Sequence, residues 1–544
     1  MWWNYTRPKP GKWVVFLGET PHEYTVYKKS VNDGLSPLLL YGKKAGAGFH
    51  FLWSVLQCQQ VLSVQTTGFV VYKFLQIAEG EKMKDTDIVI VSMGAIDGAG
   101  TTVDERIEML KVGGPEFITV GKADKYMPID FSTRDTSLST ALVAPVPLTD
   151  GELAELAGLT RKEAKRYDRH QLFGLIAAKE AMAPLEGIDV SRFACTTATG
   201  GAGLNTVAEA EAVLAAGKPL RKIHYNLGYL PNILQGYLIE KYGFTGPVGV
   251  KGDACAASAI AIIDMIRIIR AGDAEAGLVV GAEAGISDFG IGSFQVQGVL
   301  GKGLPFHTDR DGFVMGEGAA AIVMMTYAKA RKLGLKPIVK IAGYGDCGGG
   351  TTGGSITSPN AEAAAMVMGL ALAKARVPLE DVDWIKVHGT GTGAGDIAET
   401  NAVVRLALQE MFKDIARFPE LGMYLKEGLT WEEVESDPEY ALIADAVSVI
   451  AAEIKVMSMK SYIGHLLGAA AIAELVAVIS FVQAGLIPPT RGLEADGSLD
   501  PECDVVNHVR TTIVQDSIWV LLNSFGFGGV YASLLLEFLD LEDE

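Results

Sequence analysis

Cysteine is scarce in this sequence: there are five among 544 residues, and no two of them form a C-x-x-C pair. They are Cys58, Cys195, Cys255, Cys347 and Cys503. An odd, scattered set does not make the framework of a disulfide-stapled domain, and the spacing does not match a structural zinc site. We therefore expect no bound metal and a reducing compartment, in which thiols stay free.

Long hydrophobic runs and excess positive charge are also missing. The longest apolar candidate, residues 51–77, is interrupted by several glutamines and Lys73, so we expect no membrane span. Lys and Arg number 47 against 65 Asp and Glu, which gives a net charge of -18. This balance argues against general binding to nucleic acid or anionic membranes. We expect a soluble cytoplasmic protein, on which an acidic partner would need a local basic patch.

Residues 1–82 lack a clear helical or strand period, and they match neither a signal peptide nor an arginine-rich transit peptide. We treat them as an N-terminal extension of unknown role. From residue 87 onwards, strand patterns alternate with alanine-rich helical patterns, which predicts an α/β fold with buried sheets. A similar plan near 87–184 and 338–376 suggests an internal duplication. The acidic, proline-containing stretch at about 411–452 is typical of a surface insertion.

The predicted elements are as follows. Strands are expected at 87–91, 248–251, 277–283, 319–326, 338–345, 383–388, 519–523 and 531–537. Helices are expected at 150–157, 160–184, 205–216, 256–271, 361–376, 396–412 and 466–484.

Cys255 stands between the strand pattern at 248–251 and the helical pattern from 256. A thiol at a helix start meets unpaired N–H groups and the positive end of the helix dipole, which favour the nucleophilic thiolate. The alternative is a buried cysteine that acts as a small hydrophobe. Two histidines in glycine-rich surroundings, His388 and His465, could assist a thiol nucleophile by stabilising an oxyanion and moving protons. Taken singly, each is more often a hydrogen-bonded core imidazole. Lys460 could keep a nearby imidazole neutral.

Four motifs together carry a family resemblance. They are DACAAS around Cys255, HGTGTGAGD from His388, KSYIGHLLGAA from Lys460, and NSFGFGG at 523–529. Their order and approximate spacing resemble those of the elongating β-ketoacyl-[acyl carrier protein] synthases. RDGFVMGEGA at 310–319 and GLIPPT at 485–490 are similar to that family as well. The resemblance covers roughly residues 86–538.

The resemblance implies a thiolase-like fold of two similar α/β halves in a layered α-β-α-β-α arrangement. The halves would be 83–337, with the nucleophile, and 338–544, with both histidines and the insertion. It also implies a homodimer, an acyl carrier protein as partner, and no cofactor beyond the phosphopantetheine of that carrier. The implied reaction is a decarboxylative condensation of an acyl thioester with malonyl-acyl carrier protein, giving 3-oxoacyl-acyl carrier protein in fatty acid or related polyketide biosynthesis.

The resemblance also implies roles for single residues. Cys255 would accept the acyl group, His388 and His465 would assist decarboxylation, and Lys460 would support them. Asp396 and Glu399 would order this network, and Thr390 and Thr392 would bind the pantetheine arm. Phe525 and Phe527 could gate an acyl tunnel, and the backbone N–H of Phe527 could join that of Cys255 in an oxyanion hole. The residues matching carrier-docking positions are Lys162, Lys165, Arg166, Arg221 and Lys222.

Two departures from the family pattern keep alternatives open. Val530 and Tyr531 stand where Thr-Asn is usual, and Leu304 to His307 stands where Arg-Pro-Phe-Asp is usual. The alternatives are a non-catalytic ketosynthase-like partner subunit and a polyketide-type ketosynthase. His465 in the third catalytic place, and the absence of cysteine from 523–529, disfavour initiating synthases and degradative thiolases.

Overall fold

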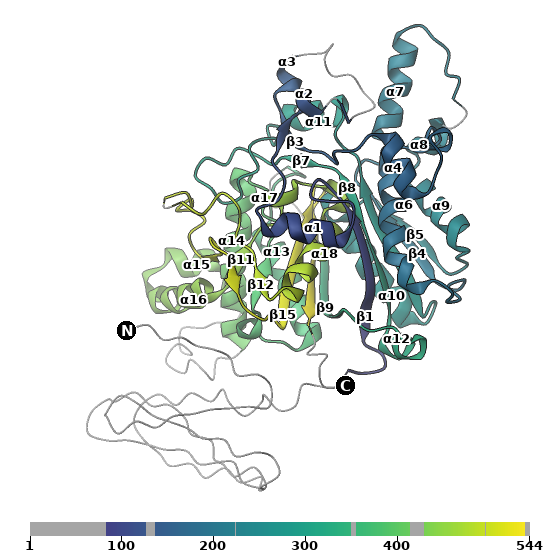
Figure 1. Cartoon of the computed structure of the whole chain (residues 1–544). Helices are drawn as coiled ribbons and strands as arrows, with labels where there is room; N and C mark the ends of the chain where they lie inside the picture. Colours follow the sequence, from purple (N-terminus) through teal and green to yellow (C-terminus); the bar gives the residue numbers. More distant parts are fainter. Residues whose placement is uncertain are drawn as a thin grey trace, which may run out of the picture. The chain divides into compact units, whose positions relative to one another are not determined.

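A computed structural model describes residues 83–123, 125–126, 136–222, 225–349, 355–413, 429–495 and 497–538. The predicted N-terminal extension, 1–82, lies outside the described residues. So does the stretch 414–428 of the predicted insertion. The chain from Met83 onwards forms one unit (Figure 1).

An 11-stranded sheet runs through this unit in the order β13-β11-β10-β15-β16-β9-β1-β8-β6-β4-β5. Its strands are β1 (Ile88–Ile96), β4 (Ala194–Ala198), β5 (Val248–Lys251), β6 (Ala276–Glu283), β8 (Gly318–Thr326), β9 (Val339–Gly348), β10 (Trp384–Lys386), β11 (Lys455–Met457), β13 (Asn507–His508), β15 (Trp519–Gly526) and β16 (Val530–Glu537). Shorter strands outside it are β2 (Ile118–Thr119), β3 (Leu142–Ala144), β7 (Met315–Gly316), β12 (Leu486–Ile487) and β14 (Ile513–Val514).

The two halves of the sheet repeat one plan. In the first half, β1 and β6 both pair antiparallel with β8, and β6, β4 and β5 continue in parallel. In the second half, β9 and β15 both pair antiparallel with β16, and β15, β10, β11 and β13 continue in parallel. Antiparallel pairing of β1 with β9 joins the halves. This repeat confirms the predicted pair of similar α/β halves.

The helices are α1 (Val103–Lys111), α2 (Val120–Ala123), α3 (Thr136–Ser139), α4 (Asp150–Ala157), α5 (Arg161–Ala164), α6 (Arg169–Met182), α7 (Leu204–Ala215), α8 (Tyr225–Tyr229), α9 (Ile233–Tyr242), α10 (Ala257–Ala271), α11 (Asp288–Val296), α12 (Tyr327–Leu333), α13 (Ala361–Ala375), α14 (Gly393–Lys413), α15 (Trp431–Ser436), α16 (Ala441–Glu453), α17 (Lys460–Ile463) and α18 (Ala470–Gln483). No helix among the described residues is long and apolar enough to cross a membrane.

The helices form layers on the sheet. Helices α10 and α18 lie in the central core cluster, with strands of both halves around them (Figure 1). Helix α6 belongs to a second cluster with β1, β6 and β8, and α13 and α14 belong to a third with β16. Burial on several sides explains why α18 is apolar over almost its whole length. The predicted α-β-α-β-α layering is confirmed.

The structure differs from the predictions in several elements, three of which are informative. The expected helix 160–184 is two helices, because Asp168 caps a new start at α6. Strand β4 is missing from the predictions, since its small residues and threonines carry no strong strand signal. The prediction of a surface insertion at 411–452 is wrong for its second part, because Val434 and Ile443 of α15 and α16 are buried in the core.

Candidate functional site

Cys255 lies in a short 3₁₀ turn, Ala254–Ala256, between β5 and α10, as the sequence predicts. The preceding residue, Ala254, has φ +47°, a left-handed conformation that is strained for a residue with a Cβ. The thiol is 8% exposed and belongs to a buried apolar cluster with Phe313, Met315 and Leu467. A sharp turn thus sets the sulfur at the start of α10, facing apolar side chains.

The thiol of Cys255 is protonated in the resting protein. Burial raises its pKa to about 12, and this effect outweighs the Lys460 ammonium, which lowers it. Glu283 and Glu474 raise the pKa further. The helix start is therefore not enough to make the thiolate the resting form, because burial raises the thiol pKa more than Lys460 and the backbone N–H lower it.

Alkylation of Cys255 by iodoacetamide is expected to be slow at pH 7 and to accelerate about tenfold per pH unit up to pH 9.5. The reason is that the thiolate fraction rises tenfold per unit while the pH stays below a pKa near 12. Peptide mass spectrometry would follow the modification of Cys255. A rate that levels off near pH 8 would contradict the raised pKa.

His388 follows β10 and is held by its backbone. Its N–H donates to Glu399 at 2.7 Å, and the N–H of Gly389 donates to the other oxygen of the same carboxylate at 2.7 Å. The Lys460 ammonium donates to the carbonyl oxygen of His388 at 2.6 Å and lies 3.3 Å from Nδ1. An ammonium beside Nδ1 makes that nitrogen the acceptor and leaves the proton on Nε2.

His465 follows α17 and Gly464. Its N–H donates to the Val314 carbonyl at 2.7 Å, and its ring packs edge-on to Phe313. The two imidazole rings are nearly perpendicular, with centroids 5.5 Å apart. Burial, and next the Lys460 ammonium, hold the pKa of each imidazole well below its usual range. Both histidines are therefore neutral at neutral pH.

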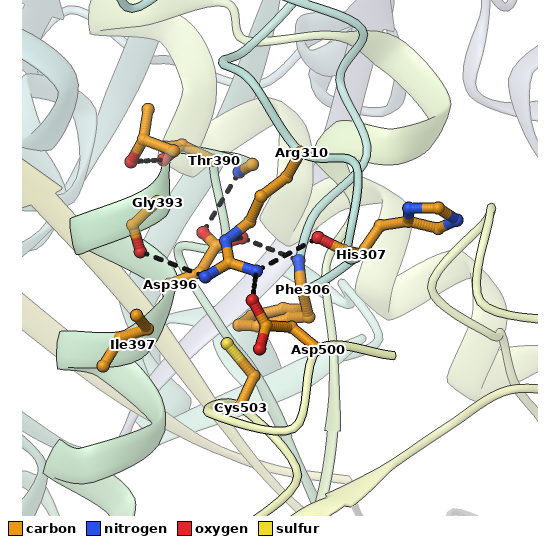
Figure 2. Close-up of polar contacts among 12 residues, drawn as sticks. Phe306, His307, Arg310, Thr390, Gly393, Asp396, Ile397, Asp500 and Cys503 are labelled. Carbon is orange, nitrogen blue, oxygen red and sulfur yellow. Dashed lines mark hydrogen bonds and ion pairs between the residues drawn. The ribbon is translucent and has the colours of Figure 1, made fainter. Parts of the chain in front are cut away.

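Asp396 lies in the first turn of α14 and binds backbone on two sides (Figure 2). It accepts the N–H of Phe306 at 2.7 Å and that of Gly391 at 3.1 Å, and Arg310 Nε lies 4.0 Å away. Burial raises the pKa of its carboxyl to about 7. Together with Glu399, it holds the glycine-rich loop after β10 through backbone N–H groups. The network-ordering role of these two acids stays a prediction.

The end of β15 lies against the turn that carries Cys255. A Cβ placed on Gly526 would lie 2.6 Å from the carbonyl oxygen of Asp253. The neighbouring Phe525 has its ring 5.6 Å from that of His388 and 5.0 Å from that of Tyr531, while Phe527 lies 6.5 Å from Phe294. The last residues of β15 thus connect the turn that carries Cys255 with the surroundings of His388.

Gly526→Ala is expected to displace this turn and to lower activity at least tenfold, since the new methyl group has no room beside the Asp253 carbonyl. Gly236→Ala in α9 is a matched control, because no heavy atom lies within 4 Å of a Cβ placed there. Steady-state assays of both variants beside the wild type would check this. Equal activity in the two variants would contradict the close packing at Gly526.

The remaining predicted residues are placed as follows. Thr390 and Thr392 lie before α14, with their hydroxyl oxygens 3.0 Å apart. The five basic residues predicted to dock a carrier are all exposed. Lys162 lies in α5, Lys165 and Arg166 follow it, and Arg221 and Lys222 precede α8. Lys222 is ion-paired with Glu209. The pantetheine and docking roles stay predictions.

Three residues of this site were not predicted: Lys386, Glu474 and Asn523. Glu474 forms a buried ion pair with Lys460 at 2.7 Å, and Lys386 pairs with the same carboxylate. The sequence contains a pattern that could have identified two of them, because Lys386 and Glu474 are isolated charged residues within apolar segments. Such charges are seldom buried without a partner.

Comparison with models of protein families shows which family this chain belongs to. The model of the β-ketoacyl synthase N-terminal domain matches residues 85–330, and that of the C-terminal domain matches residues 338–415 and 434–494. The chain belongs to the β-ketoacyl synthase family. The unmatched stretch between 415 and 434 is shorter than the insertion predicted at 411–452.

Curated proteins and solved structures agree with this membership. Nodulation protein E of Rhizobium leguminosarum bv. trifolii is 27% identical over 459 residues, which cover 83% of this chain and 98% of the relative. The 3-oxoacyl-[acyl-carrier-protein] synthase 2 of Staphylococcus aureus is 27% identical over 471 residues, with the same coverage of 83% and 98%. A β-ketoacyl synthase structure from Burkholderia phymatum covers 84% of this chain and 100% of its own, at 23% identity and a TM-score of 0.65.

These likenesses confirm the thiolase-like fold. The structure of the ishigamide ketosynthase/chain length factor has the same TM-score, 0.65, at 24% identity, and covers 84% of this chain and 99% of its own. The prediction of a ketosynthase-type condensing function, of the fatty acid or polyketide type, is confirmed at that level.

Proposed function

We propose that this β-ketoacyl synthase is catalytically active, with Cys255 as acyl acceptor and malonyl-acyl carrier protein as the second substrate. The observation that carries the proposal is the pair of neutral, perpendicular imidazoles of His388 and His465, 5.5 Å apart, beside the Lys460 ammonium. A non-catalytic partner subunit would have no need of this arrangement.

In the first step, the sulfur of Cys255 attacks the thioester carbonyl of the acyl carrier. Because the thiol is protonated at rest and Nε2 of His388 already carries a proton, the neutral imidazole of His465 accepts the thiol proton as the carbon–sulfur bond forms. The oxyanion meets the backbone N–H groups of Cys255 and Phe527, and each such donor contributes about 3 kcal/mol to lowering the barrier. The carrier's sulfur then leaves and takes up the proton, so that the acyl group rests on Cys255 and the carrier thiol is free.

In the second step, the malonyl thioester loses CO2 when the bond between its carboxylate and Cα breaks. The electron pair moves into an enolate whose oxygen accepts hydrogen bonds from the imidazoles. The Lys460 ammonium near Nδ1 of His388 keeps the proton on Nε2, where it can be donated. The carbanion attacks the acyl carbonyl, and the carbon–sulfur bond to Cys255 breaks. The sulfur leaves as a thiolate that takes one proton from water, and a 3-oxoacyl-carrier product results.

We infer an acyl carrier protein as partner, supported by the exposed basic residues on and after α5 and by a solved structure of the same fold. A type II polyketide synthase acyl-carrier protein has been solved in complex with its ketosynthase, AntDE, which shares this fold at a TM-score of 0.63 and 20% identity. Since the substrates are thioesters of the carrier's own pantetheine, the reaction needs no further cofactor. The homodimer that the resemblance implies is part of the same proposal.

The test is to mix the purified chain with acyl-carrier and malonyl-carrier protein. Release of CO2, formation of a 3-oxoacyl-carrier product and an acyl mass shift on the peptide of Cys255 are the expected results. A folded protein that gives neither product nor acyl-enzyme would overturn the proposal and favour a non-catalytic partner subunit. A profile of acyl chain lengths with defined carriers would then separate fatty acid from polyketide substrates.

A further inference from the structure

Lys386, the last residue of β10, has a fully buried side chain. The other two residues of this strand are apolar, and a lysine in such a place is costly unless its ammonium is paired and hydrogen-bonded. Its ammonium ion-pairs with Glu474 and donates to the backbone carbonyl of Asn523 at 2.6 Å. Strands β10 and β15 run in parallel and bring Lys386 opposite Leu522, which precedes Asn523.

From Glu474 a first chain of contacts leads to His388. The carboxylate of Glu474 is 1% exposed and lies between two ammonium groups, with Lys386 on one oxygen and Lys460 at 2.7 Å from the other. Lys460 in turn donates to the carbonyl of His388 and lies beside its Nδ1. One carboxylate thus balances two cations, of which one is next to the imidazole.

From Asn523 a second chain leads to the same histidine. The side-chain amide of Asn523 donates to Glu399 at 3.2 Å, and Glu399 accepts the N–H groups of His388 and Gly389. The carbonyl of Asn523 is the one that Lys386 binds. The two chains therefore close into a ring of polar contacts that begins and ends at His388, with Lys386 as the link between its arms.

We propose that Lys386 is a positioning residue of the condensing reaction. Its ammonium closes this ring and shares the carboxylate of Glu474 with Lys460. The positive charge of Lys460 is then only partly neutralised by Glu474 and acts on the imidazole of His388. The inference rests on the proposed function, in which a neutral imidazole accepts the proton of Cys255. Lys386 itself contacts neither the thiol of Cys255 nor the imidazole of His388 or His465.

The charges around the ring set the direction of the effect. The titratable groups that face it are Lys386 on β10, Lys460 on α17, Glu474 on α18, Glu399 on α14, His388 and His465. The Lys386 ammonium lowers the pKa of both imidazoles, after the larger effects of burial and Lys460. Removal of the Lys386 charge raises the pKa values of both imidazoles. On acidification, both rings therefore become protonated at a higher pH than in the wild type.

The experiment compares Lys386→Gln and Lys386→Met with the wild type. Histidine-selective ¹⁵N labelling reports the ring pKa values of His388 and His465, and 3-oxoacyl formation is measured against pH. In both variants we expect the ring pKa values and the acid limb of the rate profile to move to higher pH than in the wild type. The kcat should fall while the KM for malonyl-carrier stays within about twofold, because no substrate contact is removed.

Two controls separate charge from packing. Lys386→Arg keeps the charge and should keep the wild-type ring titration. Lys340→Gln removes a lysine of β9 that is ion-paired with Asp87 and Glu537, and it should change neither readout. If Lys386→Met does not fold, Lys386→Gln, which retains a donor for both partners, decides the question.

A folded glutamine variant with wild-type ring pKa values and acid limb would overturn the inference, as would an arginine variant that titrates like the glutamine variant. Absence of any 3-oxoacyl product from the wild type would instead overturn the proposed function. The ring titration needs no turnover, so the two failures are distinguishable.

Discussion

Cys255→Ala is expected to lower the rate of condensation by roughly 10⁴-fold or more, because the variant has no sulfur to hold the acyl group. Neither an acyl mass on the protein nor a 3-oxoacyl-carrier product should form. The imidazoles of His388 and His465 remain in place, so CO2 should still be released from malonyl-carrier. Mass spectrometry of the protein and of the carrier would measure both outcomes.

Cys347→Ala is the matched control for that variant. Cys347 is a free, half-buried thiol on β9, whose sulfur lies 3.8 Å from the carbonyl of Ala363. Its removal should leave acylation and condensation close to the wild-type rates. Condensation at the full rate by Cys255→Ala would place the nucleophile elsewhere in the chain.

Glu317→Ala is expected to reduce the free energy of unfolding by about 3–5 kcal/mol, as is typical when one partner of a buried ion pair is removed. The side chains of Glu317 and Arg169 are both fully buried, and Arg169 donates to both oxygens of Glu317 at 2.7–3.1 Å. The N–H of Val146 also donates to Glu317, at 3.0 Å. The variant leaves a buried guanidinium without its main counter-charge.

Urea denaturation of Glu317→Ala beside Arg331→Ala would check this expectation. Arg331 forms an ion pair with Asp85 at the surface, where the side chains are 55% and 67% exposed. Loss of such a pair costs at most about 1 kcal/mol. Equal midpoints for the two variants would contradict a stabilising role for the buried pair.

Local patterns in the sequence were sufficient to predict many of the helices and strands. The apolar period from residue 256 predicts α10 and sets Cys255 at its start, and the structure has both. The strands β1, β6, β8, β15 and β16 follow from runs of β-branched and aliphatic residues, since such runs pack well in a buried sheet. The family motifs name His388, Lys460 and His465, which the fold brings together.

Charges that are buried by distant parts of the chain were not predictable in the same way. Lys386 and Glu474 are 88 positions apart, and only the tertiary packing of α18 brings its carboxylate to the end of β10. The acidic stretch before residue 453 has the composition of a surface segment, yet α16 turns Ile443 and Val447 into the core. Composition reports the average of a segment, whereas burial depends on which face meets a neighbour.

The sequence by itself determined that the fold is an α/β repeat, and its family motifs named the residues that we propose for the chemistry. The tertiary structure decided the ionisation of those residues. Cys255 stands at a helix start, as the sequence indicates, but its thiol keeps its proton because the surrounding side chains exclude water. Desolvation depends on atoms contributed by many segments at once, and no local pattern contains it.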